Sequence, residues 1–327
     1  MKINYFHRNK ALGFSIQKVF RIVIDELKKK NEITEFYTPT LNSMPWDILK
    51  NSFYVFKNKK KGEIHHITGH IHDSILGLIG CKSVLTIHDL VFLDHVKNPI
   101  KKFYKWLFWL YLPIKIAKKV TCISEHTKKN ILKYLPTDKL TVIYNAVDPK
   151  YQFSPKEFNV EKPVILHIGT GWNKNLERTI EALHGINCHL RIVGKIKQEM
   201  IDKLLFYNID YSQTEGINDE EIIKEYCNCD IINFPSEYEG FGMPIIEGQA
   251  IGRIVLTSNI DPMTEVGLDT VYYVNPFDIN SMHEGYLSII SQPELREKLI
   301  KKGLENIKRF GVDKIAQDYI NLYQSIL

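Results

Sequence analysis

Cysteine is scarce in this sequence, and nothing in its placement indicates a disulfide-stabilised fold. The 327 residues include five cysteines, an odd number, dispersed along the chain: Cys81, Cys122, Cys188, Cys227 and Cys229. Chains that depend on disulfides are dense in cysteine and work in oxidising compartments. The last two cysteines enclose one residue, and no second pair completes a closed zinc site. We therefore expect a chain that works in a reducing compartment.

Long hydrophobic runs are missing as well. The longest apolar stretch, residues 106–114, is about half as long as a bilayer requires. Residues 1–9 lack the apolar centre of a signal peptide. These two absences predict a cytoplasmic location.

Lysines flank the apolar stretch on both sides, and the chain carries a net charge of +5. The flanking lysines are Lys101, Lys102, Lys105, Lys115, Lys118 and Lys119. An aromatic surface edged by lysine suits a protein that is peripheral on the inner face of an anionic membrane. A core helix whose lysines extend to water has the same pattern. For residues 97–119 we keep both interpretations.

The sequence does contain enough apolar material for two cores. Its hydrophobic content is 44%, with 17 tyrosines and 16 phenylalanines. Strand-like and helix-like patterns alternate throughout, which predicts an α/β fold with parallel sheets covered by helices on both faces. The polar segment 149–163 contains three prolines and is predicted as the linker. It separates a domain at 1–148 from a second at 164–310, which residues 311–327 follow.

The most informative segment is 234–252. An apolar run of strand type ends at Phe234, and glycines at positions 240 and 242 precede Pro244, which suits the first position of a helix. The unpaired amides of such a helix start can bind phosphate or sugar oxygens. Glu239 and Glu247 lie on either side of the glycine turn and can accept hydrogen bonds from hydroxyl groups. Either carboxylate alone is better explained as a solvated turn residue or a partner of the helix dipole, but the pair together with the glycines favours a site.

Residues 235–247 match the pattern Pro-Ser-x-x-Glu-Gly-Phe-Gly-Leu-Pro followed by a second glutamate, with Met243 in place of leucine. The chain here resembles the retaining, nucleotide-sugar-dependent glycosyltransferases of family 4, which share the two-domain GT-B fold. This resemblance implies that Glu239 contacts hydroxyls of the donor sugar and that Glu247 holds the ribose. It also places the turn Gly240, Phe241, Gly242 and Met243 along the donor. In the family the first domain binds the acceptor and the second binds the donor, and the last helix crosses back onto the first domain. The resemblance therefore implies an acceptor domain at 1–148, a donor domain at 164–310 and a returning C-terminal helix at 311–327.

Residues 164–183 match a second family segment, in which a buried strand ends at glycine and a Lys-Asn pair precedes a helix. By resemblance, Lys174 binds the diphosphate, and Thr170 and Gly171 lie in the same donor loop. A lysine at a helix start is unfavourable unless an anion arrives, which supports this role. Many relatives carry an arginine where this chain has Thr170. Arg178 is a substitute for that cation or, the interpretation we favour, an exposed helix arginine.

Other parts of the chain match the family at single glycines and at one histidine. The resemblance places the base of the donor against Gly194, Gly216 and Ile217, without identifying the base. Gly13, where many relatives have a glycine pair, is implied to approach the donor phosphate. His88 ends the segment that matches Thr-x-His, and the resemblance places it near the reacting sugar. On its residues alone, His88 would be a strand-end histidine bonded to the backbone.

Histidine is concentrated at His65, His66, His70 and His72, next to Asp73. Imidazole is a common metal ligand, but this spacing fits no closed zinc pattern, and we expect a strand that passes into a loop. His70 or His72 is a candidate for contact with the acceptor. The chain also has no Asp-x-Asp triplet, the metal-diphosphate anchor of the other large glycosyltransferase fold. Neither a metal nor another cofactor is therefore expected.

Taken together, the resemblance implies a retaining hexosyltransferase that moves a sugar from a nucleotide-sugar donor to a glycan or lipid-linked acceptor. We predict His88, Lys174 and Glu239 as its catalytic residues. The richness in lysine, asparagine and isoleucine favours a bacterium that builds a surface polysaccharide, either lipopolysaccharide O-antigen or capsule. Two alternatives stay open: a nucleotide-sugar epimerase of the same fold, and a polyanion-binding module with a degenerate sugar site. The small excess of basic residues argues against nucleic acid as a partner.

Overall fold

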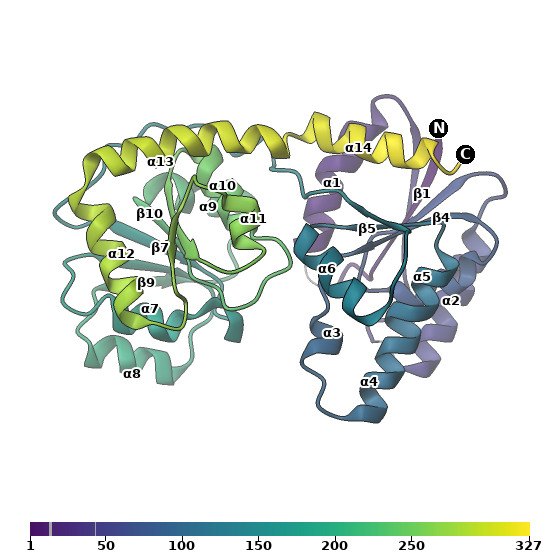
Figure 1. Ribbon diagram of the computed structural model, residues 1–327, viewed down its shortest axis with the longest axis horizontal. Coiled ribbons are helices and arrows are strands. Elements are labelled where there is room, and N and C mark those ends of the chain that lie inside the picture. Colours follow the sequence, from purple (N-terminus) through teal and green to yellow (C-terminus); the bar gives the residue numbers. More distant parts are fainter. Residues whose placement is uncertain (13–14, 43) are drawn as a thin grey trace. The chain divides into compact units, whose positions relative to one another are not determined.

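A computed structural model describes residues 1–12, 15–42 and 44–327. The chain divides into two compact units. Unit 1 comprises Met1–Ala146 and Val312–Leu327, and unit 2 is the continuous segment Val147–Gly311. Each unit contains one six-stranded sheet in which all neighbouring strands are parallel (Figure 1). The predicted α/β class with two parallel sheets is confirmed.

The elements of unit 1 are, in chain order, β1(Lys2–His7), α1(Ser15–Lys28), β2(Glu32–Tyr37), α2(Pro45–Asn58), β3(Ile64–Ile67), η1(His72–Leu78), β4(Lys82–Ile87), α3(Val91–Asp94), α4(Pro99–Lys105), η2(Trp106–Tyr111), α5(Leu112–Ile116), β5(Lys119–Cys122), α6(Glu125–Tyr134), β6(Leu140–Val142) and, from the C-terminal segment, α14(Val312–Gln324). Its strand order is β2-β1-β3-β4-β5-β6. Helices α1 and α14 contribute to one hydrophobic cluster, and α2, η1, η2, α5 and α6 contribute to a second.

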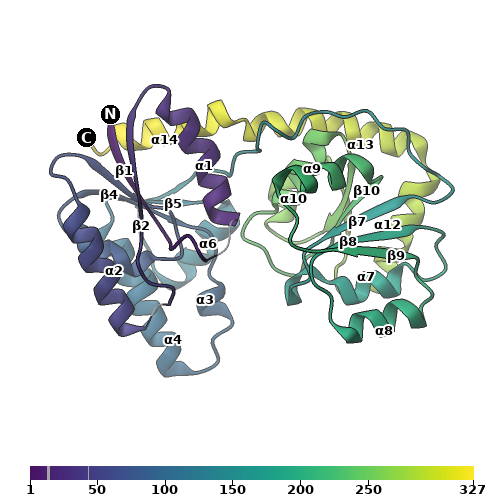
Figure 2. The same ribbon diagram turned by 180° about the vertical axis from the view of Figure 1, so that it is seen from behind.

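The elements of unit 2 are, in chain order, β7(Val164–Ile168), η3(Trp172–Lys174), α7(Leu176–Ala182), β8(His189–Val193), α8(Gln198–Phe206), β9(Tyr211–Thr214), α9(Asp219–Asn228), β10(Ile231–Phe234), α10(Met243–Ile251), β11(Ile254–Ser258), α11(Met263–Gly267), β12(Tyr272–Val274), α12(Ile279–Ser291), α13(Pro293–Asn306) and η4(Ile307–Phe310). Figure 2 shows helices on both faces of its sheet, with α7 and α8 on one face and α9 and α10 on the other. Because both faces are covered, strands such as β11 are buried along their whole length.

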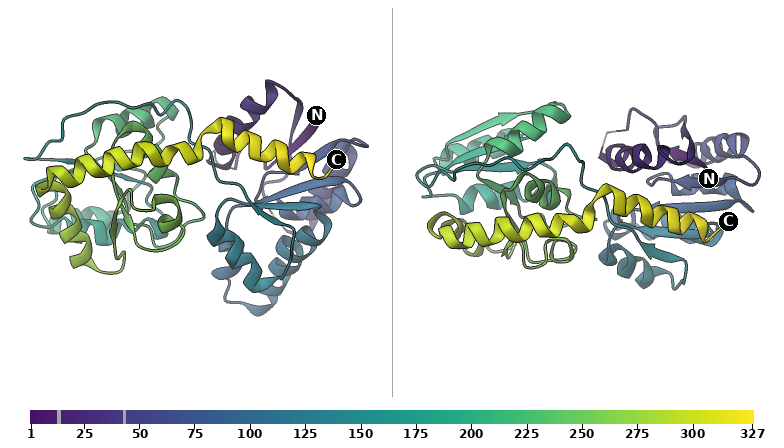
Figure 3. Two further views of the ribbon diagram at one scale, coloured as in Figure 1. Left: turned by 45° about the horizontal axis from the view of Figure 1, so that its top comes forward. Right: turned by 90° about the horizontal axis from the view of Figure 1, so that it is seen from above.

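Helix α14 follows unit 2 in sequence but packs in the core of unit 1, against α1 (Figure 3). Its apolar residues recur at helical spacing, and five of its side chains are buried: Ile315, Ala316, Tyr319, Leu322 and Tyr323. The hydroxyl of Tyr323 lies 2.6 Å from the hydroxyl of Tyr5 on β1 and 2.7 Å from Nδ1 of His66 on β3. Nε2 of His66 lies 2.8 Å from the Thr86 hydroxyl on β4. A buried chain of hydrogen bonds therefore joins α14 to three neighbouring strands.

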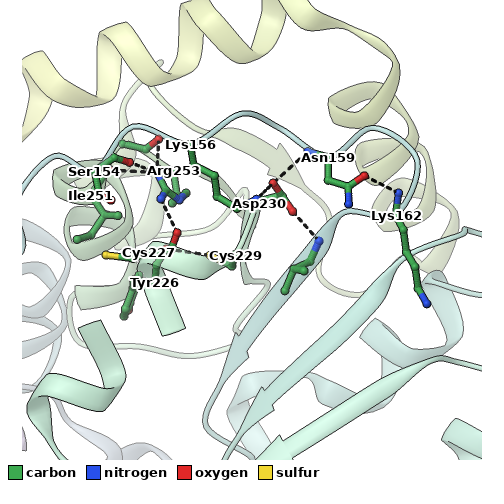
Figure 4. A network of polar contacts seen from close by, with 12 residues as sticks. Ser154, Lys156, Asn159, Lys162, Tyr226, Cys227, Cys229, Asp230, Ile251 and Arg253 are labelled. Atoms are coloured by element: carbon green, nitrogen blue, oxygen red, sulfur yellow. Dashed lines mark hydrogen bonds and ion pairs between the residues drawn. The ribbon is translucent and has the colours of Figure 1, made fainter. Parts of the chain in front are cut away.

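The segment predicted as a linker packs within unit 2. Asp230, immediately before β10, is buried. It accepts hydrogen bonds from the backbone amides of Asn159 (3.2 Å) and Val164 (2.8 Å) and pairs with Lys156. Arg253, also buried, donates to the carbonyl oxygens of Ser154 at 2.7 Å and Cys227 at 2.6 Å (Figure 4). Two charged side chains thus satisfy backbone groups of a segment that has no strand or helix of its own.

The apolar stretch at 106–114 belongs mainly to the core of unit 1. Trp109, Leu110 and Ile114 are buried, in the π-helical η2 and in α5. Nζ of Lys105 lies 3.8 Å from the centre of the Trp109 indole ring. Among the described residues, no helix combines the length and the apolar character needed to cross a membrane.

Candidate donor site

The strand order of unit 2 indicates where a ligand site would lie. In the order β12-β11-β10-β7-β8-β9, the chain moves outward from β7 in one direction and then returns to add β10 on the other side. Ligands of open parallel sheets bind outside the carboxyl ends of the strands at such a switch point. The loop after β7 contains Gly169–Asn175, and the loop after β10 contains Pro235–Gly242. Both segments that carried the resemblance therefore begin at the switch point.

Lys174 and Glu239 come together across these two loops. Nζ of Lys174 lies 2.6 Å from Oε1 of Glu239, although the residues are 65 positions apart. Their side chains are 23% and 16% exposed, so the pair remains accessible to a ligand. The same ammonium lies 4.9 Å from the centre of the Phe234 ring, at the end of β10. The structure thus joins two of the three residues predicted as catalytic.

Two asparagines fix the geometry of that pair, and sequence reasoning gave neither of them a role. The side-chain amide of Asn173 donates to Oε1 of Glu239 at 3.0 Å and to the carbonyl oxygen of Tyr238 at 2.8 Å. Asn175 is buried, has left-handed backbone dihedrals (φ 62°), and donates to the carbonyl oxygens of Pro235 at 3.1 Å and Pro276 at 2.7 Å. These contacts hold the two loops in a fixed relation. The Lys-Asn pair of the sequence motif was the signal that would have found Asn175.

Arg178 does not extend into solvent as an isolated helix arginine would. Its guanidinium pairs with the carboxylate of Glu237 and donates to Oδ1 of Asn175 at 3.0 Å. Its charge is already neutralised within the loop that follows β10. In this arrangement Arg178 stabilises the conformation of the loop after β10.

The glycine turn before α10 has the backbone that the sequence predicts. Gly242 has φ 113°, in the region that favours glycine. Helix α10 begins at Met243, so Pro244 occupies its second position and not the predicted first, still within the first turn where its missing N–H costs nothing. The Phe241 side chain is buried and meets the Phe310 ring edge-on at 5.7 Å. Only the backbone of Phe241 is therefore available to a donor.

Glu247 lies on α10 and is anchored by tyrosines. Its Oε2 accepts a hydrogen bond of 2.6 Å from the hydroxyl of Tyr226 on α9. Burial, and then the Glu247 carboxylate, raise the pKa of Tyr226 and also that of Tyr151. Both phenols therefore stay protonated and can donate to the carboxylate. Neither tyrosine was identified from the sequence, because no motif connects these positions to Glu247.

This anchoring gives a prediction for donor affinity. Glu247→Ala is expected to raise the donor Kd roughly tenfold or more, because it removes a charged acceptor of hydroxyl hydrogen bonds. Tyr226→Phe keeps the carboxylate and removes one of its anchors, so a rise of only a few-fold is expected. Calorimetric titration with the donor measures both. Glu220→Ala, an exposed carboxylate on α9, is the control, and an equal effect there would contradict a specific role for Glu247.

The other predicted donor residues lie in the loops that follow β7, β8 and β9. The Thr170 hydroxyl donates to the carbonyl oxygen of Lys195 at 2.6 Å, and a Cβ added at Gly194 would lie 3.1 Å from Cγ2 of Thr170. The loops after β7 and β8 are therefore in contact. Gly216 and Ile217 follow β9, which neighbours β8. Gly171 immediately precedes η3. Their contacts with a donor stay predictions.

His88 and its neighbours belong to unit 1. His88 is buried after β4, and its Nε2–H donates to the carbonyl oxygen of Thr68 at 2.7 Å, leaving Nδ1 as an acceptor. Burial, together with the neighbouring His70, lowers the pKa of His88 to about 4, so the ring is neutral at pH 7. Gly69 permits this position, since a Cβ there would lie 2.4 Å from the ring. Gly13 lies outside the described residues, and its predicted contact stays a prediction.

The other clustered histidines have internal partners. His72 is buried and its Nδ1 lies 2.9 Å from the carbonyl oxygen of Trp109, whereas His70 is partly exposed and lies 3.7 Å from Asp89. Of the two candidates for acceptor contact, only His70 reaches the surface. Within the described part of the chain, no three His, Cys, Asp or Glu side chains are grouped so that they could hold a metal ion.

Comparison with known families identifies the chain. The family model "Glycosyltransferase Family 4" matches residues 24–151, and "Glycosyl transferases group 1" matches residues 150–306. The chain belongs to glycosyltransferase family 4. This confirms the resemblance that the motifs at 164–183 and 235–247 carried.

Several glycosyltransferases resemble this family 4 chain along much of its length. The O-antigen chain mannosyltransferase RfbU of Salmonella typhimurium is 27% identical over 71% of this chain and 67% of its own length. A Campylobacter jejuni enzyme, N,N'-diacetylbacillosaminyl-diphospho-undecaprenol alpha-1,3-N-acetylgalactosaminyltransferase, is 22% identical over 97% of this chain and 94% of its own. These distant homologues act in the synthesis of O-antigens and other glycans.

Solved structures confirm the fold of this family 4 member. Sucrose-phosphate synthase from Thermosynechococcus elongatus superposes with a TM-score of 0.82 at 15% identity, covering 100% of this chain and 99% of the other. Anabaena HepE, solved with UDP and glucose, gives a TM-score of 0.80 at 13% identity, covering 99% and 100%. The chain has the GT-B fold, as the sequence analysis expected.

Proposed function

We propose that this family 4 glycosyltransferase moves a hexose from a nucleotide-diphosphate sugar to a hydroxyl of a glycan or lipid-linked acceptor, with retention at the anomeric carbon. The observation that carries the proposal is the Lys174–Glu239 pair at the switch point of the unit 2 sheet. A cation there suits a diphosphate, and a carboxylate beside it suits the hydroxyls of the attached sugar. Family membership supports the same assignment.

Each group has a separate part in the proposed reaction. The bond between the anomeric carbon and the diphosphate oxygen breaks, and the acceptor oxygen forms its bond on the same face of the sugar. The acceptor proton passes to the departing diphosphate. Lys174 stabilises the charge that develops on that diphosphate, helped by the amides of the Gly242 turn, and Glu239 orients the sugar. His88 is neutral at pH 7, so in any catalytic role it would act as a hydrogen-bonding group and not as a cation.

The relatives support a place in surface polysaccharide synthesis. The names of two of them assign O-antigen mannosyl transfer, and the name of a third specifies a sugar linked through a diphosphate to undecaprenol as its acceptor. For this chain we therefore infer an acceptor carried on a lipid diphosphate, at the inner face of a bacterial membrane. We also expect turnover to survive chelation of divalent metals.

Two measurements test the proposal. A thermal-shift panel of UDP-, GDP-, ADP- and TDP-sugars should identify one donor that raises the melting temperature, as mass action requires. NMR of the product formed from that donor should then show the anomeric configuration of the donor. No shift with any donor, or an inverted product, would contradict the proposal. Isomerised donor in a reaction without acceptor would indicate an epimerase instead.

A further inference from the structure

Helix α2 of unit 1 has two different faces. On one face Ile48, Asn51 and Val55 are buried. This face packs closely on η1, since the Ser52 hydroxyl donates to the carbonyl oxygen of Asp73 at 3.3 Å, and a Cβ added at Gly77 would lie 2.3 Å from a backbone oxygen of α2. Packing on η1 therefore fixes the orientation of α2, and this orientation determines which residues of α2 face the solvent.

The outer face of α2 carries large apolar side chains in solvent. Trp46, Leu49, Phe53 and Phe56 recur at spacings of three and four residues, so they form one stripe along the helix. Trp46 is 74% exposed and Phe53 66%. Two further exposed apolar side chains, Leu41 and Met44, precede the helix. Contiguous apolar surface of this kind marks an interaction site.

A second exposed apolar surface lies nearby, on α4. This helix has no buried residue, and Ile100 and Phe103 on it are 81% and 61% exposed. Burial, and then Asp73 and Asp47, raise the pKa of Tyr104 on α4, and Asp47 belongs to α2. The two helices are thus within electrostatic range of one another, and Figures 1 and 2 show them in the same region of unit 1. We call this combined surface of residues 41–42, 44–62 and 97–105 the α2–α4 face.

Positive charge is concentrated on and around the α2–α4 face. Segments 41–62 and 97–119 together contain twelve lysines, and their one acidic residue is Asp47. A chain of net charge +5 therefore carries a net charge of −6 outside these segments. Lys50 and Lys57 are exposed on α2, and Lys60 and Lys61 are exposed just beyond its end. Nζ of Lys59 lies 4.2 Å from the centre of the Phe56 ring, so charge and apolar surface are directly in contact.

We propose that the α2–α4 face docks on an anionic lipid bilayer, with α2 lying in the plane of the interface. Trp46, Phe53 and their neighbours would enter the boundary between headgroups and acyl chains, while the lysines contact the lipid phosphates. Two copies of such a face would repel one another, which argues against a dimer. In the run at 106–114 four side chains are buried and none is fully exposed, so the inserting side chains are those of α2 and the start of α4.

This inference deepens the proposed function, on which it rests for the lipid-linked acceptor. An acceptor held in the membrane by its lipid reaches only an enzyme that is also at the membrane. The docking surface is confined to unit 1, whereas the Lys174–Glu239 pair is in unit 2. Docking and donor binding can therefore be measured separately.

Vesicle flotation tests the proposal directly. The full chain is mixed with vesicles of phosphatidylglycerol and phosphatidylcholine, and in parallel with vesicles of phosphatidylcholine alone. We expect binding to the first and much weaker binding to the second. Phe53→Ser should lower the partition coefficient at least about tenfold, because one buried phenylalanine contributes that much. Lys50→Gln with Lys57→Gln should lower it roughly 25-fold, since each lysine contributes about fivefold at an anionic surface.

Matched variants exclude general effects of charge and exposure. Phe206→Ser removes a phenylalanine that is 80% exposed on α8, and Lys301→Gln with Lys314→Gln removes two exposed lysines elsewhere; both should leave flotation unchanged. Tryptophan emission should shift to shorter wavelength on vesicle binding, and Trp46→Phe should abolish most of that shift while the protein still binds.

Three outcomes would overturn docking on lipid. The first is equal flotation with both vesicle types. The second is an equal loss of binding in Phe53→Ser and Phe206→Ser. The third is that the parent protein does not float but self-associates in the ultracentrifuge, and that Phe53→Ser abolishes this self-association. The thermal shift with the donor is recorded on the same preparations. Flotation without a thermal shift by any donor would contradict the proposed transfer reaction and support the docking surface. A thermal shift with a donor but no flotation would support the transfer reaction and contradict docking.

Discussion

Replacing Lys174 by alanine is expected to lower kcat by about 100- to 1000-fold, because it removes the cation that would stabilise the departing diphosphate. Without a donor, Lys174 is neutralised by Glu239 at 2.6 Å. Donor binding must therefore draw the ammonium toward phosphate and leave the carboxylate to the sugar hydroxyls. Single-turnover kinetics at saturating donor separates this loss in the chemical step from a loss in affinity.

A second lysine of unit 2 provides the control for this measurement. Nζ of Lys203 lies 2.6 Å from Oε1 of Glu177 and 2.7 Å from Oε1 of Glu181, so it is also ion-paired, but between α8 and α7 and not between the two donor-site loops. Lys203→Ala should leave kcat within about twofold of the parent, because partly exposed ion pairs contribute little even to stability. Near-normal turnover in Lys174→Ala, or an equal loss in both variants, would rule out the assigned role of Lys174. Circular dichroism and melting temperature confirm that each variant is folded.

Tyr323→Ala is expected to destabilise unit 1 by about 3–5 kcal/mol, the usual cost of removing a large buried ring. Tyr323 is fully buried, and its hydroxyl connects Tyr5 to His66. Tyr323→Phe keeps the ring and removes the hydroxyl, so a smaller loss of about 1–3 kcal/mol is expected. Urea unfolding, with changes in midpoint at constant slope, measures both.

The exposed end of the same helix provides the comparison. Gln324→Ala changes an exposed side chain one position further on and should have almost no effect. If Tyr323→Ala were as stable as Gln324→Ala, then α14 would not be part of the unit 1 core in solution. Because the two units can unfold separately, fluorescence and calorimetry must be compared before one transition is assumed.

The fold was predictable because its evidence is local and repeated. Buried parallel strands read as continuous apolar runs, and α1 places Phe20, Val23 and Leu27 on one face at helical spacing. The glycine turn at Gly242 and the loop ending in Lys174 are short motifs in which the residue types themselves indicate the backbone conformation. The order of the helices and strands and the parallel class of both sheets follow from such patterns.

The supporting contacts of the site could not be predicted in this way. Tyr226 anchors Glu247 across 21 positions, and Asn173 reaches Glu239 across 66. Nothing in the periodicity of either partner specifies the other, because such pairs depend on how α9, α10 and the loops pack. The exposed stripe on α2 was missed for a related reason: an amphipathic helix shows which residues share a face, but only packing on η1 shows that this face is the outer one.

The position of α14 has a consequence for the order in which this chain is made. Residues 147–311 are continuous, so unit 2 needs no segment from another part of the chain to complete its fold. Residues 1–146 emerge earlier, yet they wait for the final helix to cover Tyr5 and Phe20. During that interval an apolar face of the nascent chain is uncovered. We therefore expect newly made unit 1 to depend on chaperones until α14 becomes available to it, and chains that stop before residue 312 to aggregate.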